Sequence, residues 1–153
     1  MNFEVRAATV NDVGAMLALL PRLADFDVPA HRRPEHLWEH DGALLRRWLA
    51  GDAPQCLVEV AACESGIVGL TMTSMQPDPL THAPAAHLEV IAVAARAEGK
   101  GVGKALLAAA EHNAREHGAL SITLHVIDSN RRARHFYEQS GYVGEMIRYI
   151  KSL

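Results

Sequence analysis

A cluster of glycines in the second half of the chain is the first feature that indicates a chemical role. The segment Glu98–Lys104 reads EGKGVGK and stands between an apolar run and a helix-like run. Glycines let a backbone approach a ligand closely, and the N–H groups that begin a helix attract anions. A nucleoside-triphosphate loop would need glycine in place of Glu98 and Ser or Thr in place of Ala105, and the dinucleotide pattern G-x-G-x-x-G is absent. The cluster therefore predicts a diphosphate site, with a turn that binds no ligand as the alternative.

Two titratable side chains in an upstream apolar run are candidates for proton transfer. Glu89 and His87 lie two residues apart in HLEVIAV, which reads as a strand, so they are expected on one face together with Ile91 and Val93. A carboxylate there could act as a general base. A carboxylate that is simply paired or solvated explains Glu89 nearly as well.

A phenol near the end of the chain is the candidate proton donor. Tyr137 follows Asn130 by seven residues, which places both on one side of a helix. The phenol of tyrosine has a reference pKa of about 10 and could give a proton to a leaving group of similar pKa. The alternatives are an aromatic packing role beside Phe136 for Tyr137 and a helix cap for Asn130.

Hydrophobic periodicity predicts the elements that would position these groups. Alternating or short apolar runs predict strands at residues 3–7, 55–63, 67–75, 86–93, 121–126 and 142–150. Apolar stripes at helical spacing predict helices at residues 13–20, from about residue 35, from the glycine turn to Gly118, and at 131–140. Strands and helices in this order indicate a mixed α/β sheet within a single domain, residues 1–153.

Length and composition exclude several classes of protein. A chain of 153 residues that is 49% hydrophobic can fill one core. Its net charge of −3 offers no basic excess for a nucleic-acid backbone. Apolar residues nowhere run on for the ~18 positions that a membrane helix needs, and the first residues lack the layout of a signal peptide. We therefore expect a cytoplasmic protein with neither nucleic acid nor a membrane as its partner.

Two blocks of sequence resemble a known family. HLEVIAV at residues 87–93, followed by Glu98-x-x-Gly101-x-Gly103 at a helix start, resembles the acetyl-CoA signature of the GNAT N-acetyltransferase superfamily. The stretch LHVIDSNRRARHFYEQSGY at residues 124–142 resembles the second block of that family. Together the blocks cover about residues 86–142 with the spacing that the family has.

The resemblance implies a fold and a cofactor. The fold would be of the α/β (α+β) class: a mixed, mostly antiparallel sheet of six to seven strands, splayed centrally and flanked by four helices. Acetyl-CoA would be the co-substrate, with its pantetheine arm bonded in the splay to the main chain of Ile91, Ala92 and Val93. The residues implied for its pyrophosphate and adjoining parts are Glu98, Gly99, Lys100, Gly101, Val102, Gly103, Lys104, Asn130 and Phe136.

One departure from the family concerns the charge at the pyrophosphate. The family usually has Arg or Gln where this chain has Glu98, and a carboxylate beside phosphates repels them. Arg96, Lys100 and Lys104 are expected to offset that charge.

The resemblance also implies a reaction. An N-acetyltransferase would move an acetyl group from acetyl-CoA to a primary amine by direct attack in a ternary complex, with Tyr137 as acid and Glu89 as base. The N–H of Val93 would face the thioester oxygen. The acceptor would be a small molecule or a protein or peptide amine, no metal is expected, and a homodimer is compatible with the pattern. The alternative is a non-catalytic acyl-CoA-binding or sensor domain of the same fold.

Histidines and acids in the first third of the chain form a further cluster. His31, His36, His40 and Asp41 suggest a metal site, but the spacing fixes no complete ligand set, and a solvated polar face is favoured. In the family this segment borders the acceptor pocket, so acids that face inward would attract a cationic amine.

Overall fold

A five-stranded sheet forms the centre of the protein, and the computed structural model describes residues 1–153. The first four strands follow one another in antiparallel order, and the fifth lies parallel to the fourth at the edge. The strands are β1 (Glu4–Ala7), β2 (Cys56–Cys63), β3 (Gly66–Met75), β4 (Ala86–Val93) and β5 (Ile122–Leu124).

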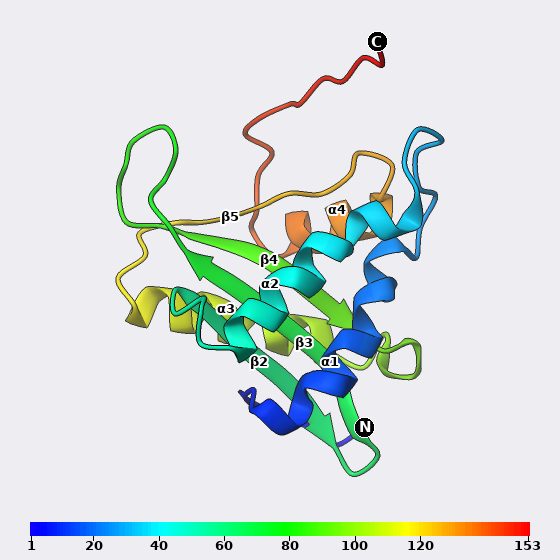
Figure 1. The fold of residues 1–153 in the computed structure, drawn as a ribbon, viewed down its shortest axis with the longest axis vertical. Coiled ribbons are helices and arrows are strands. Elements are labelled where there is room, and N and C mark those ends of the chain that lie inside the picture. Colours follow the sequence, from blue (N-terminus) through cyan, green and yellow to red (C-terminus); the bar gives the residue numbers. More distant parts are fainter.

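Four α-helices flank this sheet, as the family resemblance implied. Figure 1 shows α1 and α2 in front of the sheet and α3 behind it. The helices are α1 (Val13–Leu19), α2 (Glu39–Leu49), α3 (Val102–Glu116) and α4 (Arg131–Gln139). A 3-10 helix, η2 (Leu20–Ala24), continues α1 through Pro21, because proline cannot extend the α-helical hydrogen bonds of the preceding turn. The mixed α/β fold class is confirmed.

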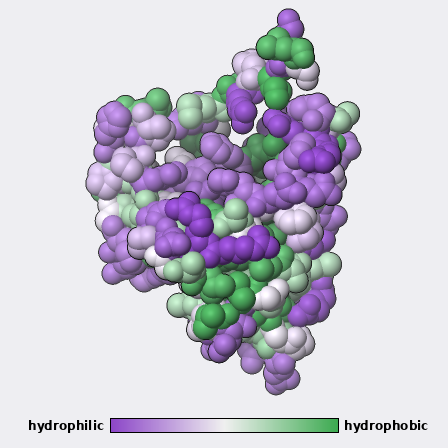
Figure 2. Space-filling view, in the orientation of Figure 1, coloured by the Kyte–Doolittle hydropathy of each residue, from purple (hydrophilic) through white to green (hydrophobic).

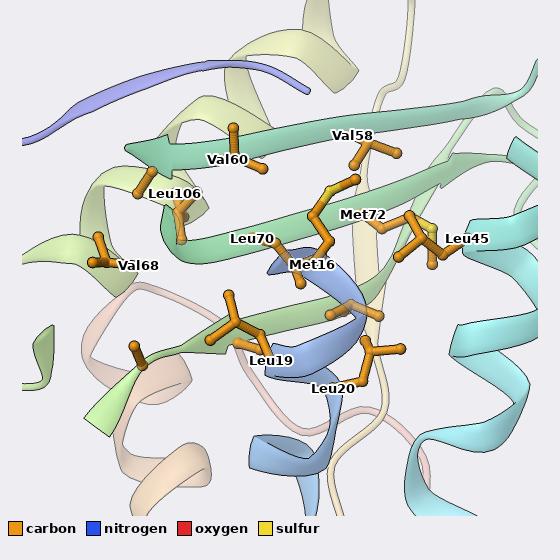
Figure 3. Close-up of a cluster of buried hydrophobic side chains, with 14 of the residues drawn as sticks. Met16, Leu19, Leu20, Leu45, Val58, Val60, Val68, Leu70, Met72 and Leu106 are labelled. Carbon is orange, nitrogen blue, oxygen red and sulfur yellow. The ribbon is translucent and has the colours of Figure 1, made fainter. Parts of the chain in front are cut away.

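The main core packs the sheet against the two front helices and against the first half of α3. Nineteen buried hydrophobic residues form one cluster. Met16 from α1 and Leu45 from α2 are fully buried there, and Figure 3 shows them close to Leu70 and Met72 of β3. The helical stripe that includes Met16 and the apolar run of β3 therefore meet, which fixes α1 and α2 against the strands that carry the site.

A β-bulge interrupts β4 at Glu89. The pairing of β3 with β4 shifts between Met72, which faces Val90, and Thr73, which faces Leu88, so Glu89 has no partner on β3. An extra residue of this kind bends a strand and re-aims its side chains. The regular alternation that the sequence predicted for this strand is therefore broken at one position.

The pairing of β4 with β5 covers only the first part of β4. It joins Ala86, His87 and Leu88 to the three residues of β5 and then stops, whereas β4 runs on to Val93. The main chain of β4 from Glu89 to Val93 thus has no strand on that side. This is the splay that the resemblance implied, but it lies at the edge of the sheet, and β5 is shorter than the strand predicted at 121–126.

The predicted last strand, at residues 142–150, is not formed, so the sheet has five strands rather than six to seven. The chain beyond Tyr142 is irregular and leaves the body of the protein (Figure 1). Its alternating hydrophobic residues are exposed, among them Val143, Ile147 and Tyr149. The pattern is that of a strand, but strands form only when a partner takes their main-chain hydrogen bonds, and the edge strand β5 offers three residues.

Hydrophilic residues cover most of the face that carries α2. Figure 2 shows them over α2 and the upper part of this face, while hydrophobic residues gather lower down, over α1. None of the helices is both long enough and apolar enough to cross a membrane.

Candidate active site

The glycine turn forms the start of α3 at one end of the splay. Gly99 and Gly101 have left-handed φ angles of 69° and 82°, which side chains rarely tolerate. Gly101 is the N-cap of α3, so the N–H groups of the first helical turn follow directly. Such groups carry partial positive charge and suit an anion. Lys100 and Lys104 are exposed beside them, whereas the side chain of Val102 is buried in the core and leaves only its main chain to a ligand.

Glu98, which precedes this turn, is neutralised by two arginines, neither of which was expected to pair with it. Its carboxylate pairs with Arg22 of η2 and, at 3.1 Å, with Arg132 of α4. Arg22 also donates from Nε to the carbonyl of Val93 at 3.1 Å. Arg96, Lys100 and Lys104, which were expected to offset this charge, form no ion pair with Glu98. Arg96 instead donates to the carbonyl of Ile67 at 3.4 Å.

The bulge at Glu89 separates two sets of side chains that were expected on one face. Val93 lies on the α3 face, because its Cγ2 is 3.7 Å from where a Cβ on Gly103 of α3 would be. Ile91 packs against the small cluster that includes Leu107 of α3. Glu89 instead lines a cavity beside α2. The predicted shared face is wrong for Glu89 because the extra residue reverses the alternation, while Ala92 is buried in the main core.

Tyr137 lies on α4 among aromatic rings. Its ring centroid is 5.3 Å from that of Phe136 and 5.7 Å from that of Tyr142. Phe136 in turn reaches α3, where its Cζ is 3.7 Å from the position of a Cβ on Gly103. Burial raises the pKa of Tyr137 to about 12, so its phenol is neutral at physiological pH. Proton transfer to a thiolate is then less favourable than the reference value of about 10 indicates.

Asn130 begins the helix that carries Tyr137. Its side-chain oxygen accepts a hydrogen bond from the N–H of Ala133 at 3.2 Å, so Asn130 is the N-cap of α4. A cap of this kind fixes the first turn of α4, and through it the direction in which Phe136 and Tyr137 project.

Two histidines lie where β4 and β5 begin to diverge. The ring centroids of His87 and His125 are 4.7 Å apart, and His87 Nδ1 is 2.8 Å from the hydroxyl oxygen of Thr123. Burial lowers the pKa of His87, and the charge of His125 acts in the same direction although Glu89 opposes it. His87 is therefore held neutral near pH 7, next to the residue predicted to be the base.

A cavity of about 280 Å³ separates Glu89 from α2. His40 and Arg47 of α2 line it, and Ser74 of β3 forms part of its wall. Burial and the charge of Glu89 raise the pKa of the carboxyl of Asp41, the residue of α2 next to His40, to about 6.

The histidines considered as metal ligands do not form a metal site. His31, His36, His40 and Asp41 are not brought together as a set of three or more ligands. The solvated alternative fits His36, whose Nδ1 accepts a hydrogen bond from the N–H of Arg33 at an exposed position, 3.1 Å away.

Arg22 and Arg47 are the site residues that sequence reasoning missed. Neither belongs to a motif, and the pair between Arg22 and Glu98 spans 76 positions of sequence. One indirect indication of them was present in the sequence: a lone carboxylate in a turn that binds anions needs cations from elsewhere in the chain.

A second cavity lies between η2 and the turn before α2. It has a volume of about 380 Å³ and is lined by Arg22 and Trp38, among other residues.

Comparison with known proteins assigns the chain to a family. The sequence pattern of the acetyltransferase (GNAT) family matches residues 20–142. The mycothiol acetyltransferase of Thermomonospora curvata is 30% identical over 83 residues, which are 54% of this chain and 26% of that protein. The chain thus spans about a quarter of the length of this curated relative.

Solved structures agree with the fold. A transcriptional regulator from Bacillus halodurans has a TM-score of 0.74 at 24% identity, over 99% of this chain and 100% of that one. The ribosomal-protein-alanine N-acetyltransferase of Brucella melitensis biovar Abortus has a TM-score of 0.71 at 20% identity, over 99% of each chain. The family match runs from η2 through the glycine turn to the end of the aromatic cluster on α4, and the protein accordingly belongs to the acetyltransferase (GNAT) family.

Proposed function

We propose that this protein moves an acetyl group from acetyl-CoA to a primary amine by direct attack in a ternary complex. The observation that carries the proposal is the splay between β4 and β5, which has the glycine turn at one end and Tyr137 along its wall. The names of its relatives support an amine acceptor, since one is a mycothiol acetyltransferase and another a ribosomal-protein-alanine N-acetyltransferase. Residues 1–153 would act as one catalytic domain.

The residues around the splay fit coenzyme A. The main chain of β4 from Glu89 to Val93 has no strand beside it and can bond an extended pantetheine arm. The N–H groups at the start of α3 suit a diphosphate. Arg22 and Arg132 bring positive charge to the same turn through Glu98. Acetyl-CoA supplies an acyl group activated as a thioester.

The charges and protons of the transfer can be assigned to residues of this chain. The amine nitrogen forms the new C–N bond, the C–S bond breaks, and the departing sulfur takes a proton from Tyr137. The N–H of Val93 would stabilise the negative oxygen, which is typically worth ~3 kcal/mol. Glu89, directly or through water, takes a proton from the amine. An α-amine is neutral about one time in ten at pH 7, so this help matters most for more basic amines.

Release of free thiol from acetyl-CoA over a panel of amines tests the proposal. Tyr137→Phe should lower kcat roughly 10²-fold and leave acetyl-CoA binding nearly unchanged, because the phenol acts only when the sulfur departs. Tyr149→Phe is the matched control, since Tyr149 is exposed in the tail and should turn over normally.

Two outcomes would contradict the proposal in different ways. Unaltered turnover in Tyr137→Phe would exclude this phenol as the acid. Tight coenzyme A binding with no thiol release for any amine would favour the non-catalytic acyl-CoA sensor instead.

A further inference from the structure

The cavity between α2 and β4 has walls of opposite charge. Glu89 lines it from the bulge of β4, and Arg47 lines it from α2. The remaining wall is mixed and includes Leu44, Gln55 and the buried side chain of Ser74. At about 280 Å³ it is slightly smaller than the ~300–1,000 Å³ that drug-sized ligands occupy, so it suits a small molecule.

The acidic end of the cavity is formed by Glu89, and Asp41 of α2 is near it. Glu89 and Asp41 are close enough for the charge of one to disfavour ionisation of the other. Neither carboxylate takes part in an ion pair of the structure. A cation placed between two such carboxylates relieves their repulsion, because it attracts both. This end therefore suits an ammonium group.

The basic end of the cavity lacks an anion. Arg47 is in no ion pair, and its recorded hydrogen bond is to the carbonyl of Asp52 at 3.2 Å. A guanidinium carries five N–H donors and binds a carboxylate through two of them at once. Most of the donor capacity of Arg47 thus remains for a ligand.

The charges at the two ends limit the acceptor. Glu89 and Arg47 line the same cavity, so a ligand with one cationic and one anionic group can meet both. Polyamines and aminoglycosides carry several cations and no carboxylate, so they would leave Arg47 without a partner.

We propose that the acceptor is a zwitterion, an amino acid or a dipeptide, with its amine at Glu89, near Asp41, and its carboxylate at Arg47. This inference rests on the proposed function, because it places the amine beside the splay where the thioester would lie. The bulge at Glu89 is what brings the reacting end of the cavity next to that edge of β4.

Glycylglycine and glycylglycinamide are the probes, because they share the amine and differ only in the carboxylate. With saturating acetyl-CoA, the KM for glycylglycine should be about tenfold below that for the amide. Arg47→Ala should remove this difference by raising the KM for glycylglycine alone, and Arg47→Lys should restore part of it. Arg46→Ala is the matched control, since Arg46 is the neighbouring arginine on α2 and does not line the cavity. An unchanged KM for acetyl-CoA in each variant shows that the fold is intact.

The possible results separate the two proposals. Thiol release with equal KM values for both probes, or a lower KM for spermidine than for glycylglycine, would overturn the zwitterion and leave acetyl transfer standing. An Arg47-dependent preference for glycylglycine in calorimetric binding, without thiol release, would support the zwitterion site and overturn acetyl transfer.

Discussion

The two ends of the sheet differ in how firmly they are held. Strands β2 to β4 contribute most of the core together with α1, α2 and the first half of α3, and several of their side chains have no exposed surface. No residue beyond Ala114 is buried, so β5, α4 and the tail are at most half-buried. The small cluster that holds them has three buried members, all supplied by β4 and α3.

The proposed base and the proposed acid therefore lie in parts of the protein that differ in packing. Glu89 projects from a strand in the firm part, and Tyr137 from a helix in the weakly packed part. Elements with few buried contacts open at lower free energy than the core. The distance between Glu89 and Tyr137 should therefore vary as α4 moves. The contacts that α4 makes with the rest of the protein limit this variation.

The largest effect should come from truncating a side chain in the firm part. Leu70→Ala should lower the free energy of unfolding by about 2–5 kcal/mol, because Leu70 is fully buried among core side chains. Leu124→Ala in β5 is the matched control and should cost less than about 1.5 kcal/mol, since Leu124 is only half-buried. Urea unfolding monitored by circular dichroism measures both. Equal losses would show that β5 is as firmly packed as β3.

A smaller effect is expected where an ion pair links the two parts. Glu98→Arg should tighten coenzyme A binding about fivefold, or ~1 kcal/mol, because it removes a negative charge at the turn and frees Arg22 and Arg132 for phosphates. Titration calorimetry gives the Kd, with Glu98→Gln as the control that removes the charge without adding one. Weaker binding in both variants would contradict this. It would show that the ion pairs of Glu98 with Arg22 and Arg132 stabilise the coenzyme A site by more than the negative charge of Glu98 weakens phosphate binding.

The smallest effect concerns the ionisation of Asp41 in the firm part. Its pKa is raised to about 6 by burial and by Glu89, with His40 acting in the opposite direction. Below pH 6 the carboxyl gains a proton and becomes neutral, so its attraction for an ammonium ion is lost as the pH falls through 6. The KM of Asp41→Asn for an amine should exceed that of the wild type about threefold at pH 7.5.

The same ratio should approach one at pH 5, because both side chains are then neutral. Comparing the two proteins at each pH removes the titration of the amine, of His40, and of His87 and His125 beside Glu89. A ratio that does not change with pH would show that Asp41 acts without its charge.

The sequence predicted the parts of this molecule that depend on local pattern. The hairpin of β2 and β3, the glycine turn at the start of α3 and the capping of α4 by Asn130 all follow from neighbouring residues. The family resemblance rested on two such local blocks, and the family match includes both.

Features that depend on distant partners could not be predicted in this way. The bulge at Glu89 exists only in the register between β3 and β4, and the bond from Arg22 to Glu98 joins segments far apart in the chain. The strand predicted at residues 142–150 failed for the same reason. Its alternation of hydrophobic residues is a local pattern, but a strand also needs a neighbouring strand to pair with. Its residues satisfied the pattern of a strand without the pairing that makes one.

Because Glu89 is the unpaired residue of β4, the presence of the proposed base depends on one extra residue in this strand. A chain with one residue fewer at this point would run as an uninterrupted ladder against β3, with every later residue of the strand in the same place as now. Only the carboxylate facing α2 would be gone, while the edge that lies open beside β5 would persist. Deletion of this one residue would therefore change which acceptor binds and leave the binding of coenzyme A intact.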